Sequence, residues 1–95
     1  MHVIRLRAAW TIADGRGERR FNRPTGLGPG TRVWLAWDGP AGDASMNGEP
    51  IDETHFCGPP RFDVTQRLRN ANVLQLGTDN AAVLETVRLE IEEPG

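Results

Sequence analysis

Three tryptophans are the side chains of this sequence best suited to hold a ligand, because an indole ring can stack on the apolar face of a sugar as it does on other rings. Trp37 alternates with Leu35, and Trp10 shares a face with the apolar residues that precede it, so we expect both in the hydrophobic core. Trp34 points to the opposite face of its strand. It is therefore our candidate stacking platform.

Polar residues close to Trp34 complete the predicted binding site. Asp38 shares its face of the strand, and Arg32 lies two residues before it on the same face. We expect Trp34, Asp38 and Arg32 to act together as ligand-binding residues. Asp63 also resembles a functional acid, but it lies just before Thr65 at a strand end, where we expect it to accept structural hydrogen bonds from the backbone or from an arginine.

The other reactive side chains do not show the spacing that a catalytic site requires. Glycoside hydrolysis needs two carboxylates about 5 to 10 Å apart across a cleft, whereas Asp52 and Glu53 are neighbours on an extended chain and point apart. His55 and Cys57 could imitate a base and a thiol, but they lie in a loop rich in Gly and Pro with no sequence signal for an orienting third group. We expect no catalytic residues and no enzymatic activity.

A metal site is not predicted either. The same stretch lacks the paired Cys or His spacing of zinc sites, and the loop carbonyls that hold calcium leave no trace in a sequence. We expect no metal ion and no cofactor.

A basic cluster formed by Arg16, Arg19, Arg20 and Arg23, with Phe21 between them, superficially suggests nucleic-acid binding. The net charge is -2, lysine is absent, and no nucleic-acid-binding motif is present, so we expect no such partner. Arginines dominate residues 1–37 and acids dominate residues 38–95. We expect the first and last strands to lie side by side and neutralise each other.

Length and composition indicate one soluble domain over residues 1–95. A chain of 95 residues has room for a single core. It has 38% hydrophobic residues, 11 Gly and 7 Pro, which indicates many turns rather than long helices. The opening residues resemble neither a signal peptide nor a membrane span. With Cys57 as the only cysteine, a cytoplasmic location and no membrane partner are expected.

Apolar and polar residues alternate along most of the chain, which predicts short β-strands. Asn47-Gly48 is the dipeptide that best tolerates the positive φ angles of a tight hairpin turn. Thr65 is expected to cap a single helical turn at 66–69, the only helix predicted, with Leu68 tucked under the sandwich. The predicted strands are 4–10, 19–23, 31–38, 43–46, 49–51, 62–64, 73–76 and 83–92, with loops at 24–30 and 52–60. About seven or eight strands indicate a compact antiparallel β-sandwich or barrel.

Four segments in a characteristic order resemble the sugar-binding jelly-roll domain of family 2 glycoside hydrolases and, more broadly, galactose-binding-like domains. They are Arg-Val-Trp-Leu-Ala-Trp-Asp-Gly at 32–39, Met-Asn-Gly-Glu-Pro-Ile at 46–51, Pro-Arg-Phe-Asp-Val-Thr at 60–65, and Arg-Leu-Arg-Asn-Ala-Asn-Val-Leu-Gln-Leu at 67–76. Together they cover about half of the chain. The resemblance implies a jelly roll, and in that fold it would place Arg5 and Arg7 near Glu90 and Glu92. Family members are usually longer and joined to a catalytic barrel, and in them the domain often serves as a structural support.

Two functions follow as expectations. The first is a non-catalytic module that binds carbohydrate, as the resemblance implies. The second is a protein-interaction or self-assembly domain, in which exposed sheet edges or the Trp34 face pair with another chain or a second copy. Which ligand is bound, and in which oligomeric state, is left open by the sequence.

Overall fold

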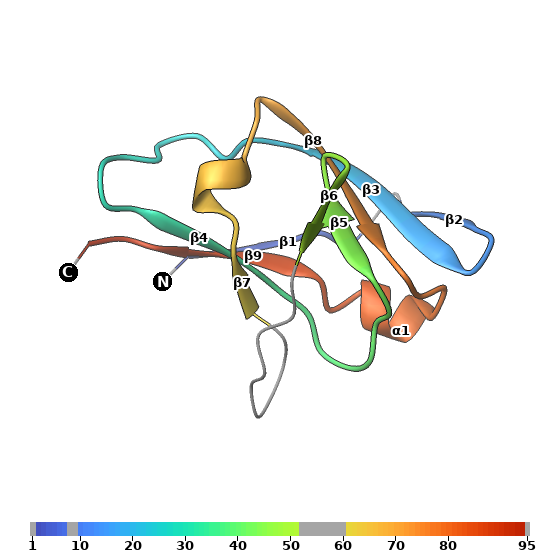
Figure 1. Ribbon diagram of the computed structural model, residues 1–95. Helices are drawn as coiled ribbons and strands as arrows, with labels where there is room; N and C mark the ends of the chain where they lie inside the picture. Colours follow the sequence, from blue (N-terminus) through green and yellow to red (C-terminus); the bar gives the residue numbers. More distant parts are fainter. Residues whose placement is uncertain (1, 8–9, 52–60, 95) are drawn as a thin grey trace.

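Two antiparallel β-sheets packed face to face form the computed structural model of the chain (Figure 1). The structure describes residues 2–7, 10–51 and 61–94. Its strands are β1 (His2–Arg5), β2 (Thr11–Ala13), β3 (Arg16–Asn22), β4 (Arg32–Ala36), β5 (Ala44–Met46), β6 (Glu49–Ile51), β7 (Arg61–Asp63), β8 (Ala71–Leu76) and β9 (Arg88–Glu92). A 3-10 turn, η1 (Thr65–Arg67), and a helix, α1 (Ala81–Leu84), complete the elements. The predicted all-β sandwich is confirmed.

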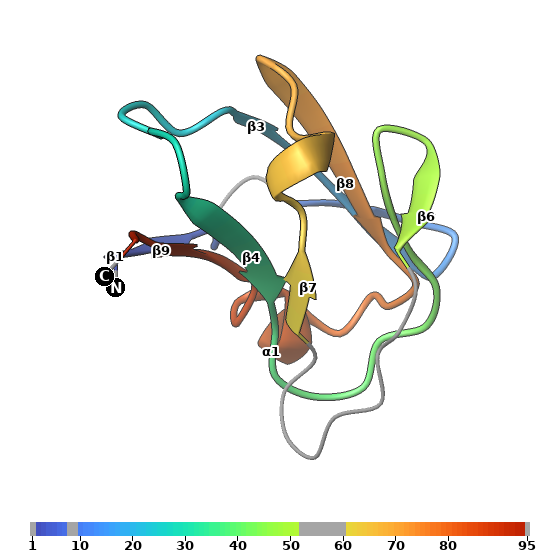
Figure 2. The ribbon, with the colours of Figure 1, turned by 60° about the vertical axis from the view of Figure 1, so that its left-hand side comes forward.

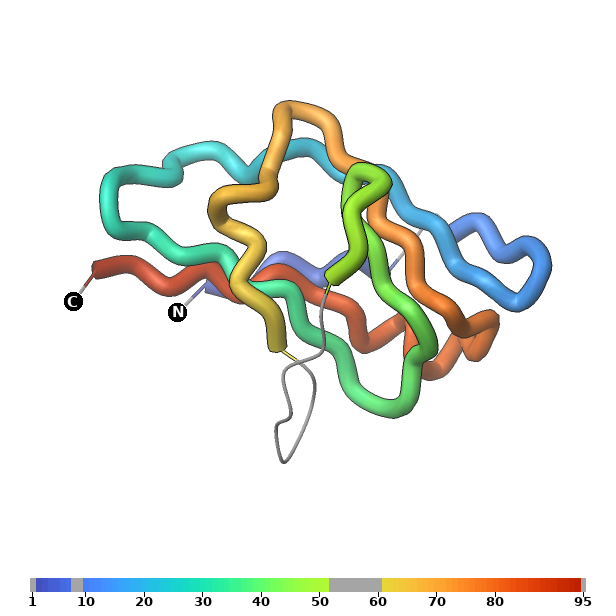
Figure 3. The backbone as a smooth tube through the Cα atoms, in the orientation of Figure 1, coloured from blue at the N-terminus to red at the C-terminus, as the bar shows by residue number. Residues whose placement is uncertain are grey.

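The chain passes from one sheet to the other at most of its connections. Sheet A has the order β1-β9-β4-β7, and sheet B has the order β2-β3-β8-β5-β6. Figure 2 shows them as two layers, and the tube in Figure 3 shows the chain crossing repeatedly between them. All seven strand pairings of the described residues are antiparallel. The fold is therefore an antiparallel β-sandwich whose sheets each combine segments from distant parts of the chain.

Two hairpins close tightly because their turns hold residues that tolerate left-handed backbone. Asn47 and Gly48 have φ angles of 55° and 81° and join β5 to β6, as the sequence predicts. Asp14 and Gly15 have φ angles of 53° and 74° and join β2 to β3. Positive φ at both central positions is the mark of the turn that matches the twist of paired strands.

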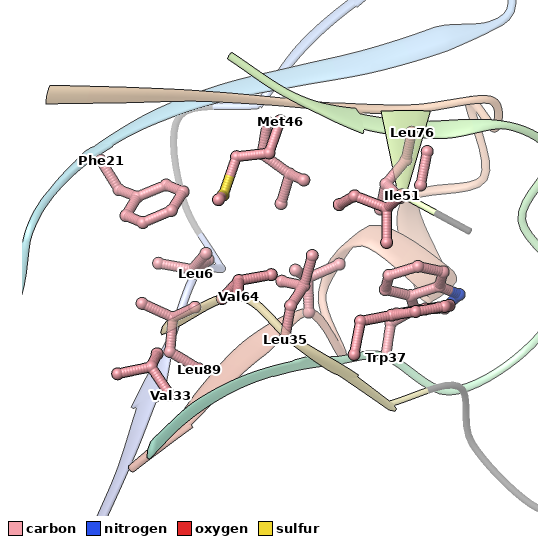
Figure 4. Packing of buried hydrophobic residues seen from close by; sticks show 14 of the residues in the cluster. Leu6, Phe21, Val33, Leu35, Trp37, Met46, Ile51, Val64, Leu76 and Leu89 are labelled. Carbon is pink, nitrogen blue, oxygen red and sulfur yellow. The ribbon is translucent and has the colours of Figure 1, made fainter. Parts of the chain in front are cut away.

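The core lies between the two sheets and is filled by one face of every described strand except β2, whose three residues are exposed (Figure 4). Leu35 and Trp37 come from the β4 segment, while Met46 and Leu76 face them from sheet B. Trp37 is 1% exposed and stacks on Phe62 with ring centroids 5.2 Å apart, which confirms it as a core residue. Predicted core positions are thus buried as the period-two pattern requires.

In the C-terminal part of the chain, the predicted strand at 83–92 is wrong in its first half. Residues 83–92 do not form a single strand, because Ala81–Leu84 is the helix α1 and the strand begins at Arg88. Asn80 caps the helix by accepting a hydrogen bond from the amide of Ala82 at 3.0 Å. Val83 and Leu84 are buried and close one end of the core.

The predicted helical turn after β7 is a 3-10 turn, and its start differs from the prediction. Thr65 does not cap it; Val64 is the cap residue, and its side chain makes no capping hydrogen bond. The Thr65 hydroxyl instead accepts a hydrogen bond from the backbone amide of Val33 at 2.8 Å. Leu68 is buried beneath the sandwich as expected.

Strands β1 and β9 lie side by side, but the predicted charge pairs between them are replaced by others. Val3 is opposite Glu90, and Arg5 is opposite Arg88. The ion pairs of Glu90 and Glu92 in the described residues are made with Arg61 and Arg88 instead. The arginines of β7 and β9 therefore neutralise the C-terminal acids.

The predicted loop at 52–60, with Asp52, Glu53, His55 and Cys57, lies outside the described residues. Within the described part of the chain, no helix is long and apolar enough to cross a membrane.

Candidate functional site

The three predicted binding residues, Arg32, Trp34 and Asp38, all belong to the outer face of sheet A. Their side chains alternate with Val33, Leu35 and Trp37, which face the core. In the sheet, Trp34 lies between Glu90 of β9 and Asp63 of β7. The structure thus brings the predicted residues onto one face, where each already contacts a neighbouring side chain.

Trp34 is covered on one ring face by Arg61. The guanidinium carbon lies 4.0 Å from the ring centroid, which is a cation–π contact. Trp34 is half-buried, and its buried indole Nε1 has no hydrogen-bond partner among the described residues. A sugar that stacked on this ring face would have to displace the guanidinium.

An ion-pair network surrounds that contact. Glu90 places one carboxylate oxygen 3.4 Å from Nε of Arg61 and the other 3.0 Å from Nε of Arg88. The first contact is an ion pair without the alignment of a hydrogen bond, since Arg61 Nε has no hydrogen-bond partner. Arg88 also reaches Asp38 at 3.3 Å, and Arg61 reaches Glu92 at 3.2 Å. The arginines and carboxylates on this part of sheet A therefore neutralise one another.

Arg32 and Asp63 form a second charged pair, 3.4 Å apart, at the β4–β7 end of the face. Asp63 also accepts hydrogen bonds from the hydroxyl and the backbone amide of Thr65 at 2.6 and 3.0 Å. Burial raises the pKa of Asp63, but these hydrogen bonds and the charge of Arg32 outweigh it and hold the pKa below its ordinary value. The predicted structural role of Asp63 is confirmed.

A separate concavity of about 720 Å³ opens at one end of the sandwich; we call it the end pocket. Its described apolar lining includes Trp37, Phe62 and Ile51. Its polar lining includes Arg16, Asp43 and Ser45. The sequence contains no local signal for this group, because its members come from β3, the segment before β5, and strands of both sheets.

The indole of Trp37 gives the end pocket an unsatisfied donor. Figure 4 shows Trp37 at the end of the core away from Phe21, with its nitrogen at the margin of the cluster. Trp37 Nε1 is buried and has no hydrogen-bond partner in the described residues. Leaving a buried donor without an acceptor costs about 1–3 kcal/mol. A ligand oxygen that accepts this hydrogen bond would recover that free energy.

Trp10 serves the fold rather than a site. Its indole Nε1 donates a 2.6 Å hydrogen bond to the carbonyl of Leu6, and its ring packs against the core. A Cβ on Gly17 would lie 3.2 Å from this ring, so the glycine allows the ring to approach β3. The prediction that Trp10 belongs to the core is supported by this partly buried position.

The basic cluster is divided by the alternation of β3. Phe21 is buried in the core, and Arg16 and Arg20 point to the outer face of sheet B. Arg19 lies on the same side as Phe21 and lines an opening that also includes Leu6 and Leu89. A row of arginines interleaved with an exposed aromatic ring is therefore not formed.

In the described ranges, no group of three or more His, Cys, Asp or Glu side chains could hold a metal ion. The side chains considered for catalysis, His55 and Cys57, fall outside those ranges. In comparisons with known proteins, neither a family model nor a curated sequence matches the chain.

Proposed function

We propose that this chain is a non-catalytic binding module of the galactose-binding-like kind and that it binds carbohydrate in the end pocket. The observation that carries the proposal is that Trp37, which lines a concavity of about 720 Å³, has a buried Nε1 without an acceptor in the described residues. Binding sites for small molecules combine an apolar lining with a few polar groups that fix orientation.

The lining suits a sugar because it offers both kinds of contact. Trp37 and Phe62 supply aromatic surface, and Asp43 and Ser45 can bond hydroxyl groups. Arg16 adds a charged donor to the lining. The sequence resemblance to sugar-binding jelly rolls supports the same ligand class. A lone cysteine in 95 residues supports a reducing, cytoplasmic location as part of the proposal.

Titration of the protein with a panel of neutral monosaccharides and disaccharides, followed by calorimetry and by amide NMR shifts, tests the proposal. Saturable shifts around Trp37 and Asp43 are expected. Trp37→Phe keeps an aromatic ring but removes the donor, so affinity should fall about fivefold, which corresponds to about 1 kcal/mol for one neutral hydrogen bond. Asp43→Ala changes an exposed residue and should weaken binding without lowering stability.

Trp34→Phe is the matched control, because it removes the other buried indole donor that lacks a partner, on the opposite face of the same strand. Binding should be unchanged in this variant. Loss of binding in Trp34→Phe alone would move the sugar to the outer face of sheet A, with Asp38 and Arg32. Absence of any saturable shift across the panel would refute carbohydrate binding.

A protein-interaction or self-assembly role is the second candidate, and one observation favours it. The large exposed hydrophobic side chains of the described residues are Val3, 41% exposed, and Ile12, 48% exposed. They lie on β1 and β2, which are edge strands of sheets A and B. Exposed edges invite pairing with another chain. A stable dimer in light scattering that Val3→Lys and Ile12→Lys dissociate, with no sugar response, would favour this role.

A further inference from the structure

The arginines of the described chain fall into two groups according to whether a carboxylate neutralises them. Arg32, Arg61, Arg67 and Arg88 are among those with a carboxylate within ion-pair distance. In the described residues no carboxylate is paired with Arg20 or Arg69, and both side chains are exposed. These two arginines therefore carry positive charge that no carboxylate of the described residues neutralises.

Arg20 and Arg69 line the same depression, of about 600 Å³, on the outer face of sheet B. Val73 of β8 lies opposite Arg20 of β3 in the sheet and contributes to the lining. The hairpin turn at Asn47-Gly48 forms another part of the wall. None of the lining residues is shared with the end pocket.

Acidic side chains close to this depression along the chain are already engaged. Glu18 shares the outer face of β3 with Arg20 and accepts a 2.9 Å hydrogen bond from Gln75. Glu49 follows the hairpin turn and lies 3.6 Å from Arg67. The positive charge of Arg20 and Arg69 is therefore left for a ligand.

Two side-chain amides, the buried one of Asn72 and the half-buried one of Asn47, hold the walls in place. Asn72, which is 1% exposed, accepts a 2.8 Å hydrogen bond from the backbone amide of Arg69 and donates one of 2.8 Å to its carbonyl. Asn47 donates to the Asn72 side chain at 3.0 Å and accepts from the amide of Val73 at 2.9 Å. The backbone that carries Arg69 is thus fixed relative to β8 and to the hairpin, which reduces the ordering cost of binding.

We infer that Arg20 and Arg69 form a binding site for one tetrahedral oxyanion, a phosphate or sulfate group, on the outer face of sheet B. A guanidinium presents parallel N–H donors that match the oxygens of such a group. Two of them in the lining of one depression can donate to different oxygens of the same group. This arginine site is independent of the proposed sugar site.

Amide NMR titration of the intact chain with inorganic phosphate, a hexose 6-phosphate and a hexose 6-sulfate tests the inference. Saturable shifts at residues 20, 69 and 73 are expected, and they should weaken as NaCl is added because salt screens exposed charges. Arg20→Gln and Arg69→Gln should each reduce affinity about tenfold, since each removes charge-assisted hydrogen bonds. Tighter binding of the hexose esters than of inorganic phosphate would identify a sugar ester as the source of the oxyanion.

Arg7→Gln is the charge-matched control, because Arg7 is exposed and does not line the depression. It should leave the affinity for phosphate unchanged. Equal weakening by all three substitutions would overturn the inference and indicate general attraction to positive charge. Shifts that follow Trp37 rather than residues 20, 69 and 73 would overturn it as well, while leaving the end pocket intact.

Discussion

Asn72→Leu should strongly lower the free energy of unfolding, although the two side chains are similar in size. The leucine has nearly the same volume, but it cannot replace the hydrogen bonds to the backbone of Arg69 or to the side chain of Asn47. The backbone amide and carbonyl of Arg69 lose their bonds to the Asn72 side chain, the Phe21 carbonyl loses one, and Asn47 Nδ2 keeps only its 3.4 Å bond to the Arg67 carbonyl. Each group left unpaired costs about 1–3 kcal/mol when water cannot reach it. Because Arg69 is exposed and Asn47 half-buried, water restores part of this loss, and we expect a decrease of about 3 kcal/mol in the free energy of unfolding.

Urea unfolding followed by circular dichroism measures this decrease, which is a large share of the roughly 5–15 kcal/mol typical of a domain. The midpoint should fall while the slope stays constant. Asn22→Leu is the control, because Asn22 is exposed and occupies the strand position next to the partner of Asn72. It should change stability by less than about 0.5 kcal/mol. A cost for Asn72→Leu no greater than that of the control would refute the reasoning.

Three further outcomes are expected from the same assay. Gly77→Ala should cost about 1–3 kcal/mol, because a Cβ there would lie 2.8 Å from facing backbone, whereas Gly28→Ala, with open space around it, should not. Glu90→Gln should cost about 1–2 kcal/mol more than Glu92→Gln, because Glu90 is less exposed and touches two arginines; equal costs would contradict this. Asp63→Asn should lower the free energy of unfolding at neutral pH but change it little below the lowered pKa of Asp63. The reason is that a carboxyl with a lowered pKa stabilises the fold above its ordinary pKa of about 3.9, and this stabilisation is lost as the pH falls through the lowered pKa. A loss of stability that does not depend on pH would contradict this.

Period-two alternation is sufficient to predict β4, β8 and β9, which is the later part of the predicted strand 83–92, because each has one face in the core. The Asn47-Gly48 turn was predicted from backbone preference alone. Helix α1 was missed because four residues cannot display a helical period, although Asn80 before Ala81 is a capping signal. Short β2 was missed because its pairing with β3, rather than its own pattern, defines it.

Candidate binding residues were harder to predict than the fold. The outward direction of Trp34 followed from alternation, but its contact with Arg61 joins residues of β4 and β7 that only the strand register brings together. The end pocket could not be predicted for the same reason, since its lining residues Arg16 and Trp37 come from different sheets. Contacts between distant segments depend on tertiary structure, which a single sequence does not display.

The winding of the chain also determines how it must fold. Of the seven strand pairings in the described residues, only β2–β3 and β5–β6 are closed by two-residue turns. The others join distant segments, and β1–β9 joins the two ends of the described chain. Closing such long loops costs entropy before any contact compensates for it, so folding over milliseconds to seconds, roughly, is expected. During that interval the apolar strands are exposed to other copies, and refolding at low protein concentration should therefore favour recovery of the native protein.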